Sequence, residues 1–287
     1  MSAPSAHTFQ HEAMATFFEV TLVGEHPRDY LRHAALAAFR EADRLEHELS
    51  RYLESSYIAR ANRLARGASL IVSPDVIEVL LLSADIAVAT RRAFDPAYAS
   101  ERPADLDPDL PPFTLDPANF TLTSLAPRLH LDLGAVGKGF ALDRMLDTLR
   151  EWQIEAALLN AGGSSLLAHG TPAPDAPGWV VGVGDGAAER TIALRDASLS
   201  GSGIAVKGEH LVDPRTGTAA PRRTRTWACA PSAAQADALS TAFFVMTAPE
   251  VAALCTAHPQ VGAALSSAAD ELEIYGALRA LVAAAET

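Results

Sequence analysis

The chain has 287 residues, of which 49% are hydrophobic and 20% are charged, so it can bury a large core as one big domain or as two lobes around a cleft. Its formal net charge of −12 leaves no basic surface of the kind that a nucleic-acid-binding protein needs. Binding of phosphate groups by such a chain must depend on local positive charge, helix N-termini or a metal ion.

The two cysteines, Cys229 and Cys255, show neither metal-ligand spacing nor a disulfide framework. We therefore expect two reduced thiols that are mostly buried.

The first residues are polar and small, with neither the basic nor the apolar region of a signal peptide. We expect a flexible leader over residues 1–13 and a single domain over residues 14–287. The longest apolar stretch, residues 76–89, contains Glu78 and Asp85 and is too short and too charged to cross a bilayer. These features predict a cytoplasmic protein without a membrane segment.

In the first half of the chain, residues 17–23 read as a strand. Apolar residues at alternating three- and four-residue spacings then predict an amphipathic helix over 31–49. A second helix is expected over 76–90, with Ser73 as its N-cap and Pro74 in its first turn. Residues 95–127 are rich in Pro and Asp, which predicts an extended surface loop, with a lid or a lobe boundary near 96–127.

The second half mixes strands and helices. Polar and apolar residues alternate over 128–133, which predicts a half-buried strand. Further strands are expected at 156–159, 179–183, 191–194 and 226–230, and helices at 140–152, at 232–246 with Ser232 as N-cap, and from Pro249. Because strict βαβ alternation is absent, we expect an α+β fold with mixed, largely antiparallel sheets packed with helices.

One carboxylate and one hydroxyl in the predicted helix 232–246 suggest a magnesium site. Asp237 and Thr241 stand four residues apart, so both lie on one helical face. Magnesium prefers oxygen ligands and usually takes one or two protein carboxylates together with substrate phosphate oxygens. The alternative is a surface carboxylate, with Ser240 and Thr241 bonding back to the preceding turn.

The sequence contains two glycine-rich turns, and their contexts predict different roles. Gly134, Gly137 and Gly139 precede a helix, so this turn could bind a phosphate at the helix N-terminus, with Lys138 adding charge. Its spacing is not that of a Walker loop, and such turns are more often structural. Residues 182–186 superficially match a dinucleotide fingerprint, but a strand follows them, so we expect a hairpin turn.

His210 precedes residues 213–217, whose Pro and Gly favour a turn on their own, so this segment can be purely structural. The histidine could carry a proton or orient a ligand, although a lone histidine is more often structural.

Several segments, taken in order, resemble the ApbE family of FAD:protein FMN transferases. They cover roughly residues 14–246, and their agreement in order is more specific than any one of them. The segments are Met14-Ala15-Thr16, Ser50-Arg51-Tyr52 with Ser55 and Asn62, Ala93-Phe94-Asp95-Pro96, Asp132-Leu133-Gly134-Ala135-Val136-Gly137-Lys138-Gly139, Asn160-Ala161-Gly162-Gly163, residues 210–217 and residues 236–241.

The resemblance implies an enzyme that binds FAD, cleaves its pyrophosphate with Mg²⁺, and transfers FMN to a Ser or Thr hydroxyl in the flavinylation motif of an acceptor flavoprotein, with release of AMP. It implies that Asp237, Thr241 and the backbone carbonyl of Ala135 hold the metal, with Ser240 beside them. The implied FAD-binding residues are Met14, Tyr52, Ala93, Phe94, Asp95, Asp132, Lys138 and Leu211. Besides Asp237 as a catalytic residue, His210 is a candidate acceptor for the hydroxyl proton.

The chain departs from the family pattern near the substrate mouth. Arg91 and Arg92 replace a glycine-containing pair, and residues 199–203 keep only part of a Thr-Ser-Gly-x-Tyr segment. Two alternatives therefore stay open beside the transferase. One is an FAD pyrophosphatase that releases FMN and AMP, and the other is a non-catalytic FAD-binding module.

Overall fold

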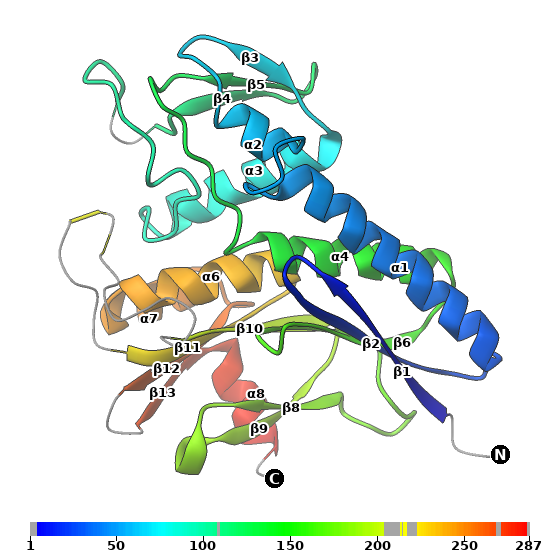
Figure 1. Cartoon of the computed structure of the whole chain (residues 1–287). Helices are drawn as coiled ribbons and strands as arrows, with labels where there is room; N and C mark the ends of the chain where they lie inside the picture. Colours follow the sequence, from blue (N-terminus) through cyan, green and yellow to red (C-terminus); the bar gives the residue numbers. More distant parts are fainter. Residues whose placement is uncertain are drawn as a thin grey trace.

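An eight-stranded antiparallel sheet forms the middle layer of the computed structural model, which describes residues 5–107, 110–203, 213, 215–216, 223–267 and 271–285 (Figure 1). Its strands, in spatial order, are β1 (Ser5–Ala13), β2 (Thr16–Gly24), β6 (Ala156–Ala161), β7 (Ser165–His169), β10 (Ala197–Gly203), β11 (Arg223–Ala230), β12 (Gly262–Ser267) and β13 (Leu272–Gly276).

Three helices cover one face of this sheet: α1 (Arg28–Leu49), α4 (Gly137–Glu151) and α6 (Ala233–Val245) (Figure 1). Their apolar side chains form the main core, in which Leu45, Leu142 and Phe243 are fully buried. Helix α6 is apolar almost all round, as expected for a helix enclosed between other elements. Two of the polar residues it carries, Asp237 and Ser240, are therefore held inside the protein.

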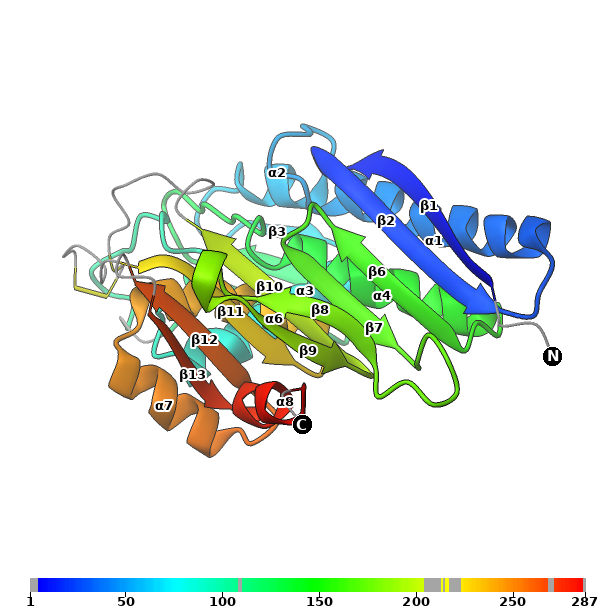
Figure 2. The same cartoon turned by 90° about the horizontal axis from the view of Figure 1, so that it is seen from below.

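The other face carries the hairpin of β8 (Trp179–Val183) and β9 (Arg190–Leu194) together with α8 (Ala277–Ala285) (Figure 2). This layer has its own apolar cluster, which includes Trp179, Ile192 and Trp227. Helix α7 (Ala248–Ala257) packs beside β12 and β13. A short 3-10 helix, Gly186–Ala188, lies in the turn of the hairpin, as expected for a turn at residues 182–186.

A second, three-stranded sheet lies at the top of Figure 1 with α2 (Tyr57–Ala61) and α3 (Pro74–Ala89). Its spatial order is β3 (Ser69–Ile71), β5 (Thr121–Ser124) and β4 (Phe113–Asp116). The pairing is antiparallel throughout, as it is in the large sheet. The expected α+β class with largely antiparallel sheets is therefore confirmed.

Local sequence signals located most elements correctly. The strand expected at 17–23 is β2, and the helix expected at 31–49 is α1. Ser73 caps α3 by accepting a hydrogen bond from the Val76 N–H (3.3 Å), and Ser232 caps α6 in the same way from the Gln235 N–H (3.2 Å). Both cysteines are free and buried, and burial raises the pKa of each thiol to about 11.

Three expectations were wrong. Residues 5–13 are not a flexible leader, because they form β1 and pair with β2 along their whole length. Residues 95–127 are not one extended loop, because they contain β4 and β5. Residues 128–133 form no strand, although Leu129, Leu131 and Leu133 are buried as the alternation required. None of the described residues belongs to a helix that is long and apolar enough to cross a membrane.

Candidate active site

The centre of the candidate site is the carboxylate of Asp237, which α6 carries into the interior with 4% of the residue exposed. A buried charge needs partners, and Asp237 has them on both oxygens. Its Oδ2 accepts a hydrogen bond from the Gly139 N–H (3.2 Å) and lies 3.6 Å from the Lys138 ammonium. Its Oδ1 accepts hydrogen bonds from the hydroxyls of Ser165 (3.4 Å) and Ser200 (3.3 Å). The alternative of a surface carboxylate is excluded.

The hydroxyl groups one turn further along α6 face the same strand of the sheet. Ser202 Oγ on β10 lies 2.9 Å from Ser240 Oγ and 3.4 Å from Thr241 Oγ1. Ser240 also donates a hydrogen bond to the Asp237 carbonyl (2.8 Å), as the back-bonding alternative required. Because Asp237 and Thr241 both meet serines of β10, the predicted common helical face is confirmed.

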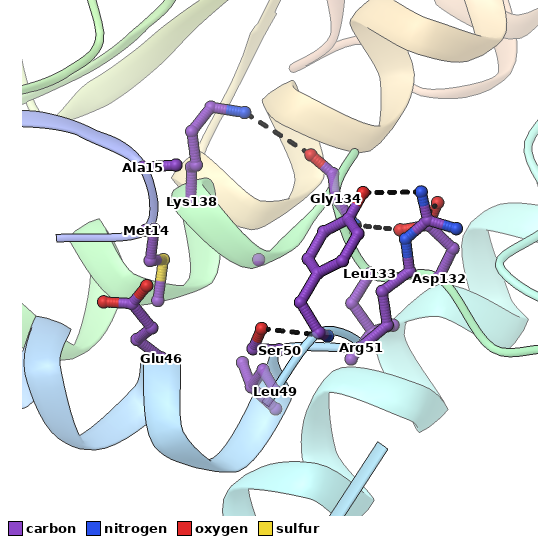
Figure 3. Close-up of a pocket in the computed structure, with 12 residues that line it drawn as sticks. Met14, Ala15, Glu46, Leu49, Ser50, Arg51, Asp132, Leu133, Gly134 and Lys138 are labelled. Atoms are coloured by element: carbon purple, nitrogen blue, oxygen red, sulfur yellow. Dashed lines mark hydrogen bonds and ion pairs between the residues drawn. The ribbon is translucent and has the colours of Figure 1, made fainter. Parts of the chain in front are cut away.

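The turn before α4 supplies further polar groups. The N–H groups of Val136 and Gly137 both bond to the Leu133 carbonyl (3.1 and 2.7 Å), which closes a tight turn before the helix begins at Gly137. The first turn of α4 has no acidic residue of its own, and the anion that meets its positive end is the Asp237 carboxylate from α6. Lys138 donates to the Gly134 carbonyl (3.4 Å) and adds its own charge (Figure 3).

Asn62 explains why residues 128–133 lie beside the site without being a strand. Its side-chain amide donates to the Leu131 carbonyl (2.9 Å) and accepts from the Leu131 N–H (2.6 Å), so one side chain replaces a strand partner. The Asp132 N–H bonds to the Pro96 carbonyl (2.8 Å), and Asp132 Oδ1 accepts from the Gly134 N–H (2.9 Å). These bonds hold Asp132 at the entrance to the turn.

A cavity of about 230 Å³ opens between this turn, the end of α1 and the β1–β2 hairpin (Figure 3). Of the expected FAD-binding residues, Met14, Tyr52, Asp132 and Lys138 line it. The other lining residues are Ala15, Glu46, Leu49, Ser50, Arg51, Leu133, Gly134 and Gly137.

Two features of the cavity wall are chemically unusual. Met14 and Ala15 have φ values of 52° and 56°, so a two-residue hairpin loop holds two non-glycine residues in a left-handed conformation. Backbone strain of this kind is often found at functional sites. Arg51 lies 3.5 Å from Asp132, donates to the Tyr52 hydroxyl (2.6 Å) and sits over the Tyr52 ring. Tyr52 itself is 79% exposed, which leaves its ring available to a ligand.

The remaining expected residues lie elsewhere. Ala93 and Phe94 belong to the main apolar core, and neither lines this cavity. Asp95 is not a solvated loop carboxylate, because its side chain is 9% exposed, is paired with Arg92, and accepts a hydrogen bond from the Ala97 N–H (2.8 Å). His210 and Leu211 fall outside the described residues.

Beyond His210, two described residues anchor the following turn. Asp213 accepts hydrogen bonds from the backbone and side chain of Arg215, and Arg215 also pairs with Glu250 of α7 (2.8 Å). Hydrogen bonds from Arg215 hold the pKa of Asp213 below its usual range. Burial would raise the pKa of Glu250, but bonds from Arg215 and Thr247 outweigh it and lower this pKa to about 2. All three groups are therefore charged at neutral pH.

The oxygen atoms around Asp237 suit Mg²⁺, which shares its ligands between protein and substrate, better than a metal ion whose ligands all come from the protein. Among the residues that the structure describes, no three His, Cys, Asp or Glu side chains cluster to form a closed metal cage. Asp237 instead offers one carboxylate, with hydroxyl and carbonyl oxygens nearby, which suits a hard cation that also binds substrate phosphates. The ammonium of Lys138 shows that this carboxylate already accommodates a neighbouring cation.

Sequence reasoning missed Ser165 and Ser200, whose fully buried hydroxyls hold Asp237 Oδ1. A serine in a strand gives no local signal of this role. The sequence patterns also did not indicate Asp143 and Arg223, which contact the two ends of α6.

Comparison with known proteins agrees with this architecture. The chain is 29% identical over 276 residues to the FAD:protein FMN transferase of Treponema pallidum, which covers 80% of this chain and 76% of that protein. The fold matches the apo flavinyl transferase ApbE of Pseudomonas stutzeri with a TM-score of 0.81, at 19% identity and 97% coverage of both chains. The flavin transferase ApbE of Vibrio cholerae matches with a TM-score of 0.79, at 18% identity, with 95% of this chain and 97% of that chain covered.

The ApbE family model matches residues 14–265, which include both the Asp132–Gly139 turn and α6. The transferase class predicted from the sequence is thereby confirmed. The chain belongs to the ApbE family.

Proposed function

We propose that this protein transfers the FMN part of FAD to a Ser or Thr hydroxyl of an acceptor flavoprotein, releases AMP, and requires Mg²⁺. The observation that carries the proposal is the buried Asp237 carboxylate, 3.6 Å from the Lys138 ammonium in the first turn of α4. Such a site combines an anchor for a cation with positive charge for a pyrophosphate. The names of the relatives support FAD as the substrate.

In the proposed reaction, the acceptor hydroxyl oxygen attacks the phosphorus of the FMN part. A new P–O bond forms while the bond to the bridging oxygen breaks, and AMP leaves with that electron pair. The hydroxyl proton passes to a base, for which we propose His210.

In this proposal Asp237, Thr241 and the Ala135 carbonyl would hold Mg²⁺, with Ser240 beside them. When bound, Mg²⁺ would neutralise pyrophosphate charge and stabilise the leaving phosphate. Ser165 and Ser200 bond Asp237 Oδ1, so Oδ2 stays directed towards Lys138. The Lys138 ammonium would bind phosphate oxygens, because phosphoryl transfer depends mainly on positioning and charge neutralisation.

Met14, Tyr52 and Asp132 are the proposed contacts of the flavin nucleotide in the cavity, and Leu211 is proposed from the resemblance. The buried positions of Ala93 and Phe94 favour a role in shaping the wall behind the site. The pairing of Asp95 with Arg92 favours the same role. A cytoplasmic location and a single domain over residues 14–287 stay predictions.

The test is incubation of the purified chain with FAD and MgCl₂, with and without an acceptor that carries a Ser/Thr flavinylation motif. We expect acceptor-dependent AMP release and covalent fluorescence on the acceptor, both abolished by EDTA and by Asp237→Asn. The matched control is Asp85→Asn, which removes an exposed carboxylate from α3 and should leave both signals unchanged. AMP without labelling would indicate a pyrophosphatase, and bound FAD without AMP a binding module.

A further inference from the structure

The N-terminus of α6 is held by a side chain from another helix. Asp143 of α4 accepts hydrogen bonds from the N–H groups of Ala233 (2.8 Å) and Ala234 (2.9 Å), which are unpaired within α6 because they lie in its first turn. Burial raises the pKa of Asp143 to about 6, although these two bonds lower it. The carboxylate therefore adds to the Ser232 cap and joins α6 to α4.

A second contact between the same two helices lies one turn away. Gly139 precedes Asp143 by four residues on α4, and its N–H donates to Asp237 Oδ2, four residues after Ala233. At Gly139 the helices touch through their backbones, since a Cβ there would lie 2.7 Å from the Ala234 nitrogen. Asp143 and Gly139 thus contact successive turns of α6 and fix its register against α4.

The other end of α6 is also fixed. The buried Arg223 guanidinium donates to the carbonyls of Phe243 and Met246, at the last turn of the helix. An anion at the N-terminus and a cation at the C-terminus both complement the helix dipole. A slip of one residue along α6 would turn Asp237 by about 100° away from Lys138, because an α-helix has 3.6 residues per turn.

We infer that Asp143 is a positioning residue for the active site: it sets the register of α6 on α4, and so holds Asp237 where it meets Lys138 and the metal. This inference rests on the proposed function for the identity of the metal. Asp143 lies outside the proposed metal and flavin contacts and acts only through α6.

The test uses Asp143→Asn. The asparagine side-chain oxygen can still accept one of the two hydrogen bonds from α6, but the NH₂ group faces the other backbone N–H and cannot accept from it. We expect Mn²⁺ affinity, measured by EPR with FAD present, to fall by about 10- to 100-fold, as for other outer-shell changes at metal sites. AMP release should fall at limiting Mg²⁺ and recover largely at high Mg²⁺, with little change in the KM for FAD. If Asp143→Asn fails to fold, Asp143→Glu keeps the charge but lengthens the reach, and should show a smaller loss of the same kind.

Two variants on the same helix separate positioning from general stability. Leu149→Val removes a methylene from a fully buried side chain, and Asp147→Asn removes an exposed carboxylate that pairs with Arg144. Both should keep wild-type Mn²⁺ affinity. An Asp143→Asn protein that bound Mn²⁺ as well as Leu149→Val at a similar Tm would overturn the inference. If the wild-type chain bound Mn²⁺ without releasing AMP, the proposed transferase function would be refuted, but the positioning role of Asp143 would still be tested by the affinities. If the wild-type chain bound no Mn²⁺ at all, both the proposed function and the positioning role would be overturned.

Discussion

Replacing Gly139 with alanine puts the contact between α4 and α6 to a direct test. The added Cβ would lie 2.7 Å from the Ala234 nitrogen and still closer to the Ala233 carbonyl. Ordinary contacts between carbon and oxygen are about 3.3 Å or longer, so the backbone of α6 would have to retreat by about 1 Å. Neither neighbour is a flexible side chain that could turn aside.

The expected magnitudes follow from that displacement. Overpacking of this kind costs about 1–3 kcal/mol, and we expect about 3 kcal/mol here because backbone meets backbone. Alanine regains about 1 kcal/mol of helix propensity over glycine, which leaves a net loss of about 2 kcal/mol. A misplacement of about 1 Å in a catalytic group can reduce a rate by about 100-fold, and we expect such a loss in AMP release because Asp237 moves with α6.

The assay compares thermal unfolding and AMP release for Gly139→Ala and the wild type. Gly137→Ala is the matched stability control, because a Cβ at Gly137 meets no atom within 4 Å and its φ is ordinary. Its Tm should not fall. A Gly139→Ala protein with wild-type Tm and wild-type AMP release would refute the reasoning, because α6 could then not be seated against α4 as described.

Three further predictions concern single charges or backbone positions. Lys138→Met should lower kcat for AMP release by about 100-fold or more, because it removes positive charge beside Asp237; a rate within threefold of wild type would contradict this. Arg91→Gly should raise the free energy of unfolding by about 0.5–1 kcal/mol in urea titrations, because an exposed arginine there has a φ of 49°; lower stability would count against it. Glu250→Gln should destabilise the protein at neutral pH, because a pKa lowered from 4.5 to about 2 stabilises the fold above pH 4.5 and this contribution is lost as pH falls towards 2. Unfolding curves of Glu250→Gln and wild type should therefore converge on acidification, and a difference that stays constant between pH 7 and pH 3 would exclude the Arg215 pair as its source.

The segment 128–133 shows where sequence reasoning stops. Alternation correctly predicted that Leu129, Leu131 and Leu133 point into the core. It could not predict the hydrogen-bond partner of the backbone, which is the Asn62 side chain rather than a neighbouring strand. Periodicity reports which side of a segment is buried, whereas a strand also requires a second backbone alongside it.

The missed strand β1 has a different cause. Residues 5–13 lie at the edge of the sheet and are mostly exposed, so few apolar residues are needed there. Polar composition alone therefore suggested a flexible leader. What orders the segment is its long ladder with β2, and pairing of this kind depends on a partner that local composition does not reveal.

Around Asp237, the residues of α6 could be predicted from the sequence, but their partners in the sheet could not. The spacing of four between Asp237 and Thr241 identified a helical face, and the structure confirms that face. Its partner is the strand β10, where Ser200 and Ser202 are two residues apart and so point to one side of the sheet. Four residues of helix rise about 6 Å and two residues of strand rise about 6.6 Å, so the two rows can run side by side with nearly equal spacing. Such a match of polar pairs, four apart in a helix and two apart in a strand, could be searched for in a sequence. The choice of strand could not be made that way, because the position of β10 in the sheet depends on the spatial order of the strands, which spacing in the sequence does not reveal.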